Sequence, residues 1–168
     1  MDENPKKIEV DAARFVSYVL QKLQSDDTGF RAALTRADNP ATEAQAWSVL
    51  VKFCDLKNDR QRLPLALIGA CMARVRAEEN GKQSFGEALQ LCKEKLGEDD
   101  ERIERKLRRV LTCDDTLELV QVLRPILRFV VSQGNVALDY IQLLKDVLYF
   151  NEKTKLIWAS QYYNVPKK

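Results

Sequence analysis

The chain has 168 residues, of which 45% are hydrophobic and 31% are charged, with few glycines and prolines. This is the composition of an ordinary globular protein, long enough for one sizeable core or for two small helical bundles that share an interface. The 27 cations and 25 acids leave a net charge of only +2. Bulk charge is therefore too small to attract a polyanion, and any such attraction has to come from local clusters of cations.

Hydrophobic residues recur at helical spacing along nearly the whole chain, and no strand-like alternation exceeds four residues. The sequence therefore predicts an all-α fold of eight or nine short helices. The polar stretch 76–83, with Asn80-Gly81 as a flexible break, is the predicted boundary between an N-terminal helical bundle (9–80) and a C-terminal one (81–165). In chain order, helices are expected near residues 9–23, 29–37, 42–53, 64–75, 84–95, 98–112, 114–131, 138–150 and 151–162.

Local signals add detail to these helices. The helix at 64–75 is apolar on nearly all sides, with Pro64 in its first turn, so we expect it at the centre of the N-terminal half. Trp47 shares its spacing with a buried stripe that includes Val51, so we expect its ring in the core rather than as a platform for base stacking. Pro125 should kink the helix at 114–131 or split it in two.

The stretch 98–112, EDDERIERKLRRVLT, predicts a helix with two chemically different faces. Asp99 and Asp100 would lie at its start, where acids suit the positive end of the helix dipole. Its apolar residues form a stripe that needs a core to pack against: Ile103, Leu107, Val110 and Leu111. Four cations at i, i+3, i+4 and i+7 share another face: Arg102, Arg105, Lys106 and Arg109.

Two interpretations of this basic face are open. Glutamates stand four residues before Arg102, Arg105 and Arg108, the favourable order for ion pairs worth about 0.2–0.5 kcal/mol each in an isolated helix. A solvated, salt-bridged surface would therefore look much the same. Lys106 and Arg109, however, have no acid four residues before them, and the planar fork of arginine suits phosphate. The second interpretation is a helix that contacts phosphate groups.

The chain contains no histidine. This excludes Ser-His-Asp and Cys-His activation of a nucleophile, acid–base catalysis by histidine, and zinc sites that use histidine. No DxD, GxxxxGK[ST] or GxGxxG motif is present to support metal-dependent or nucleotide-dependent chemistry. The sequence therefore predicts a protein that is not an enzyme and that has no metal site or cofactor.

Nothing in the sequence indicates a membrane span or a targeting segment. No apolar run approaches the roughly 18–20 residues that span a bilayer, and MDENPKKIEV at the start lacks the pattern of a signal or transit peptide. We therefore expect a cytoplasmic protein. The cysteines form no CxxC pair, so we expect them as free core or near-core residues in a reducing compartment: Cys54, Cys71, Cys92 and Cys113.

Five groups of residues, spread over about 15–163, resemble one protein family in their order and spacing. They are GFRAALTRADNP (29–40) followed by Trp47, SFGEAL (84–89), IERKLRRVLTCDD (103–115), LDYIQLLKDVLYF (138–150) and WASQYY (158–163). In this order they are similar to the CasB family, the small subunit of the type I-E CRISPR Cascade surveillance complex. Each motif alone is unspecific, and the resemblance rests on their succession along nearly the whole chain.

The resemblance implies a non-catalytic, all-helical subunit with an N-terminal and a C-terminal bundle. It implies as partners other Cascade subunits, a second copy of the chain, the guide RNA and single-stranded DNA. The basic surfaces are then expected to lie along the nucleic-acid path and to stabilise the displaced strand of the R-loop. Strand exchange is nearly balanced in free energy, so modest contacts to backbone phosphates can tip it. Such contacts do not depend on base sequence and weaken with salt.

Position by position, the resemblance carries basic contact residues over to Arg36, Arg62, Arg105/Lys106 and Arg124, and to Lys153 or Lys155 in an uncertain register. The sequence departs from the family at Glu87 and Asp115, where relatives often carry a cation, and Arg102 and Arg109 would compensate for those losses. The predicted nucleic-acid-binding residues are Arg36, Arg62, Arg102, Arg105, Lys106, Arg109 and Arg124.

Two other functions compete with this one. The first is a helical protein–protein adaptor whose charged faces are merely solvated, and convergence of the predicted cations on one surface would argue against it. The second is a metal-dependent nuclease, which needs clustered acids. The acidic pairs at 26–27, 99–100 and 114–115 stand at helix starts or turns, where capping explains them more simply.

Overall fold

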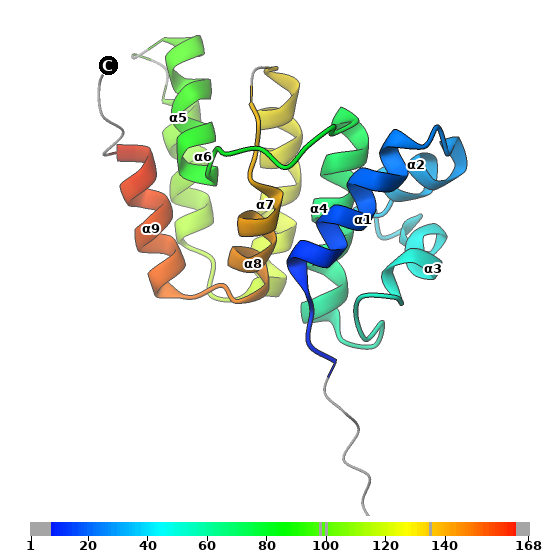
Figure 1. Ribbon diagram of the computed structural model, residues 1–168. Coiled ribbons are helices and arrows are strands. Elements are labelled where there is room, and N and C mark those ends of the chain that lie inside the picture. Colours follow the sequence, from blue (N-terminus) through cyan, green and yellow to red (C-terminus); the bar gives the residue numbers. More distant parts are fainter. Residues whose placement is uncertain (1–7, 98, 100, 135, 164–168) are drawn as a thin grey trace, which may run out of the picture.

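The computed structural model describes residues 8–97, 99, 101–134 and 136–163, and Figure 1 shows how their helices are arranged. Nine α-helices and one 3-10 helix, η1 (Glu43–Ala46), form within these residues, which confirms the predicted all-α fold. None of the described helices is long and apolar enough to cross a membrane. The α-helices are α1 (Ala12–Gln24), α2 (Thr28–Thr35), α3 (Trp47–Leu50), α4 (Asp59–Val75), α5 (Phe85–Leu96), α6 (Arg102–Leu111), α7 (Thr116–Ser132), α8 (Tyr140–Leu148) and α9 (Glu152–Tyr163).

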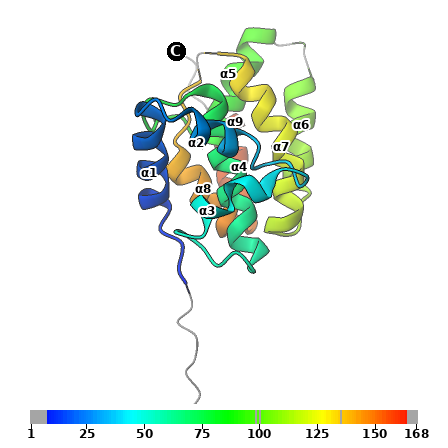
Figure 2. The same ribbon diagram turned by 90° about the vertical axis from the view of Figure 1, so that its right-hand side faces the viewer.

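Helix α4 lies at the centre of the molecule, because every residue from 64 to 73 is buried. Helices α1, α2 and α3 pack on it from the N-terminal half, and α7 and α8 pack on it from the C-terminal half (Figures 1 and 2). Helices α5, α6 and α9 lie at the far end from α2 and α3 (Figure 1). One continuous set of buried side chains joins all these elements. The expected position of 64–75 is confirmed, whereas the division into bundles at 9–80 and 81–165 stays a prediction.

The predicted boundary at Asn80-Gly81 is hydrogen-bonded to the connection that precedes α8. The backbone N–H of Gly81 donates to the carbonyl oxygen of Leu138 at 2.9 Å, and Gly81 is buried. The side-chain oxygen of Asn80 accepts from the backbone N–H of Tyr140 at 2.7 Å, in the first turn of α8. This contact, the Gly81 junction, ties the end of the N-terminal half to the C-terminal half.

The prediction of a single helix at 42–53 is wrong. The segment forms η1 and then the one-turn helix α3, because its first buried residues recur every third position, as a 3-10 helix requires: Glu43, Ala46 and Val49. Trp47 is 43% exposed and Val51 is 54% exposed, so the prediction that both lie in the core is also wrong. The indole Nε1 of Trp47 donates to the Oε2 atom of the buried Glu43 at 2.5 Å, which holds one edge of the ring at the surface.

Pro64 was expected in the first turn of its helix, and Pro125 was expected either to kink the helix at 114–131 or to split it in two. Helix α4 begins at Asp59, capped by the side chain of Asn58, so Pro64 lies inside it rather than in its first turn. Helix α7 continues past Pro125 as one helix, so the predicted split is wrong. Pro125 and Gln121 are both exposed, and water can therefore reach the Gln121 carbonyl that a proline ring leaves without an N–H partner.

Candidate nucleic-acid interface

Helix α6 presents the basic face that the sequence predicts, on a shorter helix than expected. It begins at Arg102, after Asp99, while Glu98 and Asp100 lie outside the described residues. Three residues of its apolar stripe are fully buried, namely Ile103, Leu107 and Val110, whereas Leu111 is half-buried. The helix packs on α5 and α7. The cations on the neighbouring flank, called the α6 basic face below, are exposed apart from the half-buried Lys106: Arg102, Arg105, Lys106 and Arg109.

The opposite flank of α6 carries a neutralised pair. Arg108 donates to Glu104 at 2.9 Å, which confirms one of the three expected ion pairs. The hydroxyl of Tyr163, at the end of α9, also donates to Glu104 at 2.9 Å. This hydrogen bond from Tyr163, followed by the charge of Arg108, holds the pKa of the Glu104 carboxyl below its usual range. The solvated, salt-bridged interpretation therefore fits the Glu104 flank and does not extend to Arg105 and Arg109 on the α6 basic face.

Lys106 shows which side of α7 borders the α6 basic face. Its Nζ atom lies 4.8 Å from the centre of the Phe129 ring, a cation–π contact that orients the ammonium group. Arg124 precedes Phe129 by five residues, which places it about 140° further around α7. Arg124 therefore does not join the α6 basic face, although the sequence assigned both to one function.

A second group of arginines surrounds a buried carboxylate, and the sequence analysis missed it. The Asp38 side chain is only 3% exposed and accepts hydrogen bonds from Arg128 Nη2 at 3.0 Å and Arg128 Nε at 3.4 Å. Arg74 Nη2 donates to both Asp38 oxygens at 3.4 Å and to the carbonyl oxygen of Thr35 at 3.2 Å. These three residues, the Asp38 cluster, come from the loop after α2, from α4 and from α7. No local sequence pattern could have revealed a contact between side chains so far apart in the chain.

Two of the predicted cations lie beside the Asp38 cluster. Arg36 is exposed two residues before Asp38, and its Nη1 donates to Gln45 at 3.4 Å. Arg124 stands one helical turn before Arg128 on the same flank of α7. It is half-buried, and its Nε atom is buried without a hydrogen-bond partner among the described residues. Apart from Arg62, the predicted cations therefore form two groups: the α6 basic face, and Arg36 with Arg124 beside the Asp38 cluster.

Arg62 belongs to neither group, and its side chain has a structural position. Its side chain is 17% exposed, and its Nε donates to the buried Glu43 at 3.0 Å. A second nitrogen of the guanidinium lies 2.8 Å from Asp59. Two carboxylates and the Leu56 carbonyl oxygen thus occupy most of its donors, and this network fixes η1 on the start of α4. The geometry favours a structural role for Arg62 over contact with phosphate.

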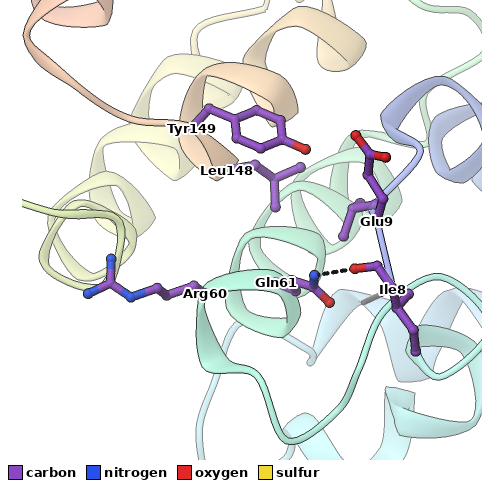
Figure 3. Close-up of a pocket in the computed structure, with 7 residues that line it drawn as sticks. Ile8, Glu9, Arg60, Gln61, Leu148 and Tyr149 are labelled. Atoms are coloured by element: carbon purple, nitrogen blue, oxygen red, sulfur yellow. Dashed lines mark hydrogen bonds between the residues drawn. The ribbon is translucent and has the colours of Figure 1, made fainter. Parts of the chain in front are cut away.

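A cavity of about 430 Å³ lies where the N-terminal segment crosses α4 and the end of α8 (Figure 3). Gln61 Nε2 donates to the Ile8 carbonyl oxygen at 2.7 Å, which fastens the segment to α4. Figure 3 shows that the guanidinium of Arg60 extends away from Glu9 and Ile8. None of the predicted contact residues lines the cavity. One of its lining residues, Gln61, attaches the N-terminal segment to α4.

Two of the acidic pairs that a nuclease would need each supply one helix cap. Asp27 accepts the backbone N–H of Phe30 at 2.9 Å at the start of α2, and Asp115 accepts that of Glu118 at 2.9 Å at the start of α7. This confirms the capping explanation for these two residues. Within the described part of the chain, no group of three His, Cys, Asp or Glu residues is placed to hold a metal ion.

The four cysteines are reduced and buried, which confirms their predicted place in the core. Burial raises the pKa of the Cys54 thiol to about 11 and that of the Cys71 thiol to about 12. Burial also raises the pKa of Cys92 and Cys113. A raised pKa keeps the thiol protonated and so removes the thiolate that would act as a nucleophile.

We expect the native protein to react with a disulfide reagent at about pH 8 far more slowly than the unfolded chain does. A thiol whose pKa rises from about 8.5 to 11 loses its thiolate on the order of 100-fold at that pH, before any steric protection by the core. The release of thionitrobenzoate, followed in buffer and in concentrated guanidinium chloride, measures both rates. A native thiol that reacts at the unfolded rate would show that its helix opens readily.

The fold and the site together define a class: a small all-α protein with a partly unpaired basic helix face and, in the residues described, no cluster of potential metal ligands. The sequence matches the family of the CRISPR-associated protein Cse2 over residues 30–163. The chain therefore belongs to this family, the CasB family of Cascade subunits that its motifs resemble.

Two solved structures share the fold, and both come from Thermus thermophilus. The structure of CasB superposes with a TM-score of 0.68 at 20% identity, over 94% of this chain and 100% of that chain. The structure of a CRISPR-associated protein of the Cse2 family gives a TM-score of 0.68 at 21% identity, over the same shares. None of the curated proteins matches the sequence. At such low identities, the structural likeness extends to the fold and not to individual contact residues.

Proposed function

We propose that this chain is a non-catalytic Cascade subunit that contacts the nucleic-acid backbone and stabilises the displaced strand of the R-loop. The observation that carries the proposal is the α6 basic face, on which Arg105 and Arg109 are exposed. Exposed guanidinium groups one turn apart can each present two donors to a phosphate. Because R-loop formation is nearly balanced, a few such contacts would shift it.

The proposed partners follow from this role. They are the guide RNA, single-stranded DNA, other Cascade subunits and a second copy of the chain. The α6 basic face would form the principal contact, and Arg36 and Arg124 would extend the path along a second surface. Contacts of this kind are electrostatic and independent of base sequence, so we expect affinity to fall steeply with salt.

The test is fluorescence anisotropy with a labelled single strand across a salt series, comparing wild type with Arg105→Ala/Arg109→Ala. Each phosphate contact to a single strand contributes about 0.7 to the slope of log affinity against log salt, so the double variant should lose about 1.4. Lys106 is left in place because its ammonium group lies over the Phe129 ring.

A matched control removes the same charge elsewhere. Arg108→Ala/Lys145→Ala takes one arginine from the opposite flank of α6 and one exposed lysine from α8. This control should retain the wild-type slope. Equal losses in both double variants would mean that only net charge matters, and an unchanged Arg105/Arg109 variant would refute contact through the α6 basic face.

A helical adaptor without nucleic-acid contact is the alternative function, and one observation favours it. Helix α9 exposes large apolar side chains, with Leu156 68% exposed and Ile157 42% exposed. Exposed apolar groups of this kind suit a protein partner. Absence of any salt-dependent binding by the wild-type chain would make this the leading function.

A further inference from the structure

A groove in the N-terminal half of the molecule is lined by cations and aromatic rings. It has a volume of about 310 Å³ and lies between α1 and the turn that follows α3. The residues of α1 that line it recur at i, i+3, i+4 and i+7 and therefore share one flank of that helix. The lining of this surface, called the α1–α3 groove below, includes no acid: Arg14, Ser17, Tyr18, Gln21, Lys52 and Phe53.

The cations of the α1–α3 groove are held in place without an acidic partner. The guanidinium carbon of Arg14 lies 4.8 Å from the centre of the Phe53 ring. The ammonium group of Lys52 lies 5.1 Å from the centre of the Tyr18 ring and donates to the Tyr18 hydroxyl at 3.0 Å. Neither cation forms an ion pair with an acid in the described part of the chain. Two oriented positive charges thus line the groove and lack a counter-charge.

Large exposed apolar side chains stand just before Lys52 on the chain. Trp47 is 43% exposed, and Val51, one helical turn later, is 54% exposed. Exposed apolar groups next to arginine and tyrosine are typical of contacts between proteins. A nucleic-acid strand would gain less here, because Val51 offers no charge or donor to a phosphate. A cation also lies over each ring of the groove, so neither ring presents that face to a base for stacking.

We propose that the α1–α3 groove docks an acidic segment of a protein partner, whose Asp or Glu carboxylates bind Arg14 and Lys52. Arginine presents two parallel donors to a carboxylate, and lysine attracts it as a compact charge. The Ser17 hydroxyl and the Gln21 amide, both exposed, are further donors for the segment. Because the cation–π contacts orient both cations beforehand, less side-chain freedom is lost on binding.

The inference rests on the proposed function only in taking another protein as partner, and it gives that partner a surface on this chain. It does not rest on contact between the α6 basic face and nucleic acid. Helices α3 and α6 lie at opposite ends of the molecule (Figure 1), so the two surfaces are tested by separate substitutions.

The test measures, by anisotropy at low salt, how a fluorescein-labelled peptide of glutamate interspersed with leucine binds to wild type and to Arg14→Gln/Lys52→Gln. Two lost charge contacts at a partly exposed site should weaken binding roughly 10-fold. Thermal unfolding checks that the variant keeps its fold. Arg108→Gln/Lys145→Gln removes the same charge from α6 and α8 and should bind the peptide as wild type does. Equal losses in both double variants would overturn the proposal, because net charge alone would then explain binding.

A second measurement uses the wild-type chain and does not depend on the stability of a variant. The ring ¹³C–¹H signals of Tyr18 and Phe53 should shift as the glutamate peptide is added, because a bound carboxylate changes the field of the cations over these rings. The exposed ring of Tyr149, which lies outside the groove, should keep its signals. Tyr18→Phe and Phe53→Leu assign the signals. Unmoved signals from both groove rings would overturn the proposal.

The outcomes separate the groove from the α6 contact. Arg105→Ala/Arg109→Ala should bind the peptide as wild type does, and loss of peptide binding in that variant alone would overturn docking at the groove. An oligothymidylate that shifts the Tyr18 and Phe53 signals, where the peptide does not, would assign the groove to nucleic acid and overturn it as well. Peptide binding at the groove without any salt-dependent binding of oligothymidylate would support the docking site and refute the α6 contact.

Discussion

Replacing Gly81 by alanine is expected to lower the free energy of unfolding by about 3 kcal/mol, the upper end of the usual cost of over-packing. A Cβ atom at this position would lie 2.0 Å from the carbonyl oxygen of Ala137 and 2.8 Å from that of Leu138. Both are backbone atoms, which cannot rotate away as a side chain can. The Gly81 N–H also donates to Leu138, so making room for the methyl group would strain or break that hydrogen bond.

Urea denaturation followed by far-UV circular dichroism measures this loss. Gly29→Ala is the matched control, because Gly29 lies exposed in the first turn of α2 and its nearest atom to a new Cβ is Asp27 Oδ1 at 3.6 Å. The control should be neutral or stabilising by about 0.4–1 kcal/mol, through a less flexible unfolded chain. Equal stability of the two variants would mean that the Gly81 junction adjusts freely and does not tie the halves together.

The features that could be predicted from the sequence are those set by neighbouring residues. The period of Ile103, Leu107 and Val110 fixed which flank of α6 would be buried, and the basic flank followed from it. The absence of CxxC pairs correctly predicted that the cysteines would be free and buried. These inferences needed no knowledge of which helices pack against each other.

The features that could not be predicted depend on contacts between distant parts of the chain. Nothing local links Asp38 to Arg128, because the fold alone brings the loop after α2 to α7. Arg62 has the appearance of an unpaired cation in the sequence, but in the fold it forms an ion pair with Glu43 of η1. Trp47 was misplaced because a helical period was assumed where a 3-10 helix forms.

The prediction that Pro125 would split its helix was wrong for a related physical reason. Pro125 was expected to kink α7 or to split it, because the ring removes one hydrogen bond. That loss falls on the exposed side of the helix, where water can replace the missing partner, while the apolar stripe on the other side keeps the helix packed. Tertiary packing thus overrode the local penalty, and a single sequence does not show on which side of a helix a lost bond will lie.

Truncating Trp158 to alanine is expected to be the second large loss, about 3–5 kcal/mol, the usual range for removing a fully buried aromatic side chain. The ring is inaccessible to solvent, and its centroid lies 4.7 Å from that of the tilted Phe85 ring on α5 and 5.8 Å from that of Phe150. Its Nε1 also donates to Asp146 at 2.9 Å, so truncation leaves that carboxylate with one donor fewer. Helix α9 would therefore lose its main anchor on α5.

The neighbouring residue supplies the control, because Ile157 precedes Trp158 on α9 and is 42% exposed. Ile157→Ala should change the free energy of unfolding by no more than about 0.5 kcal/mol. Trp158→Phe keeps most of the ring volume and removes the bond to Asp146, so an intermediate loss of about 1 kcal/mol or more is expected. Since 1 kcal/mol shifts the midpoint by about 2–4 °C in a chain of this size, thermal unfolding resolves the three variants. If Trp158→Ala and Ile157→Ala lowered the midpoint equally, α9 would not be anchored through Trp158, and the Glu104–Tyr163 contact at its far end would have to hold it in place.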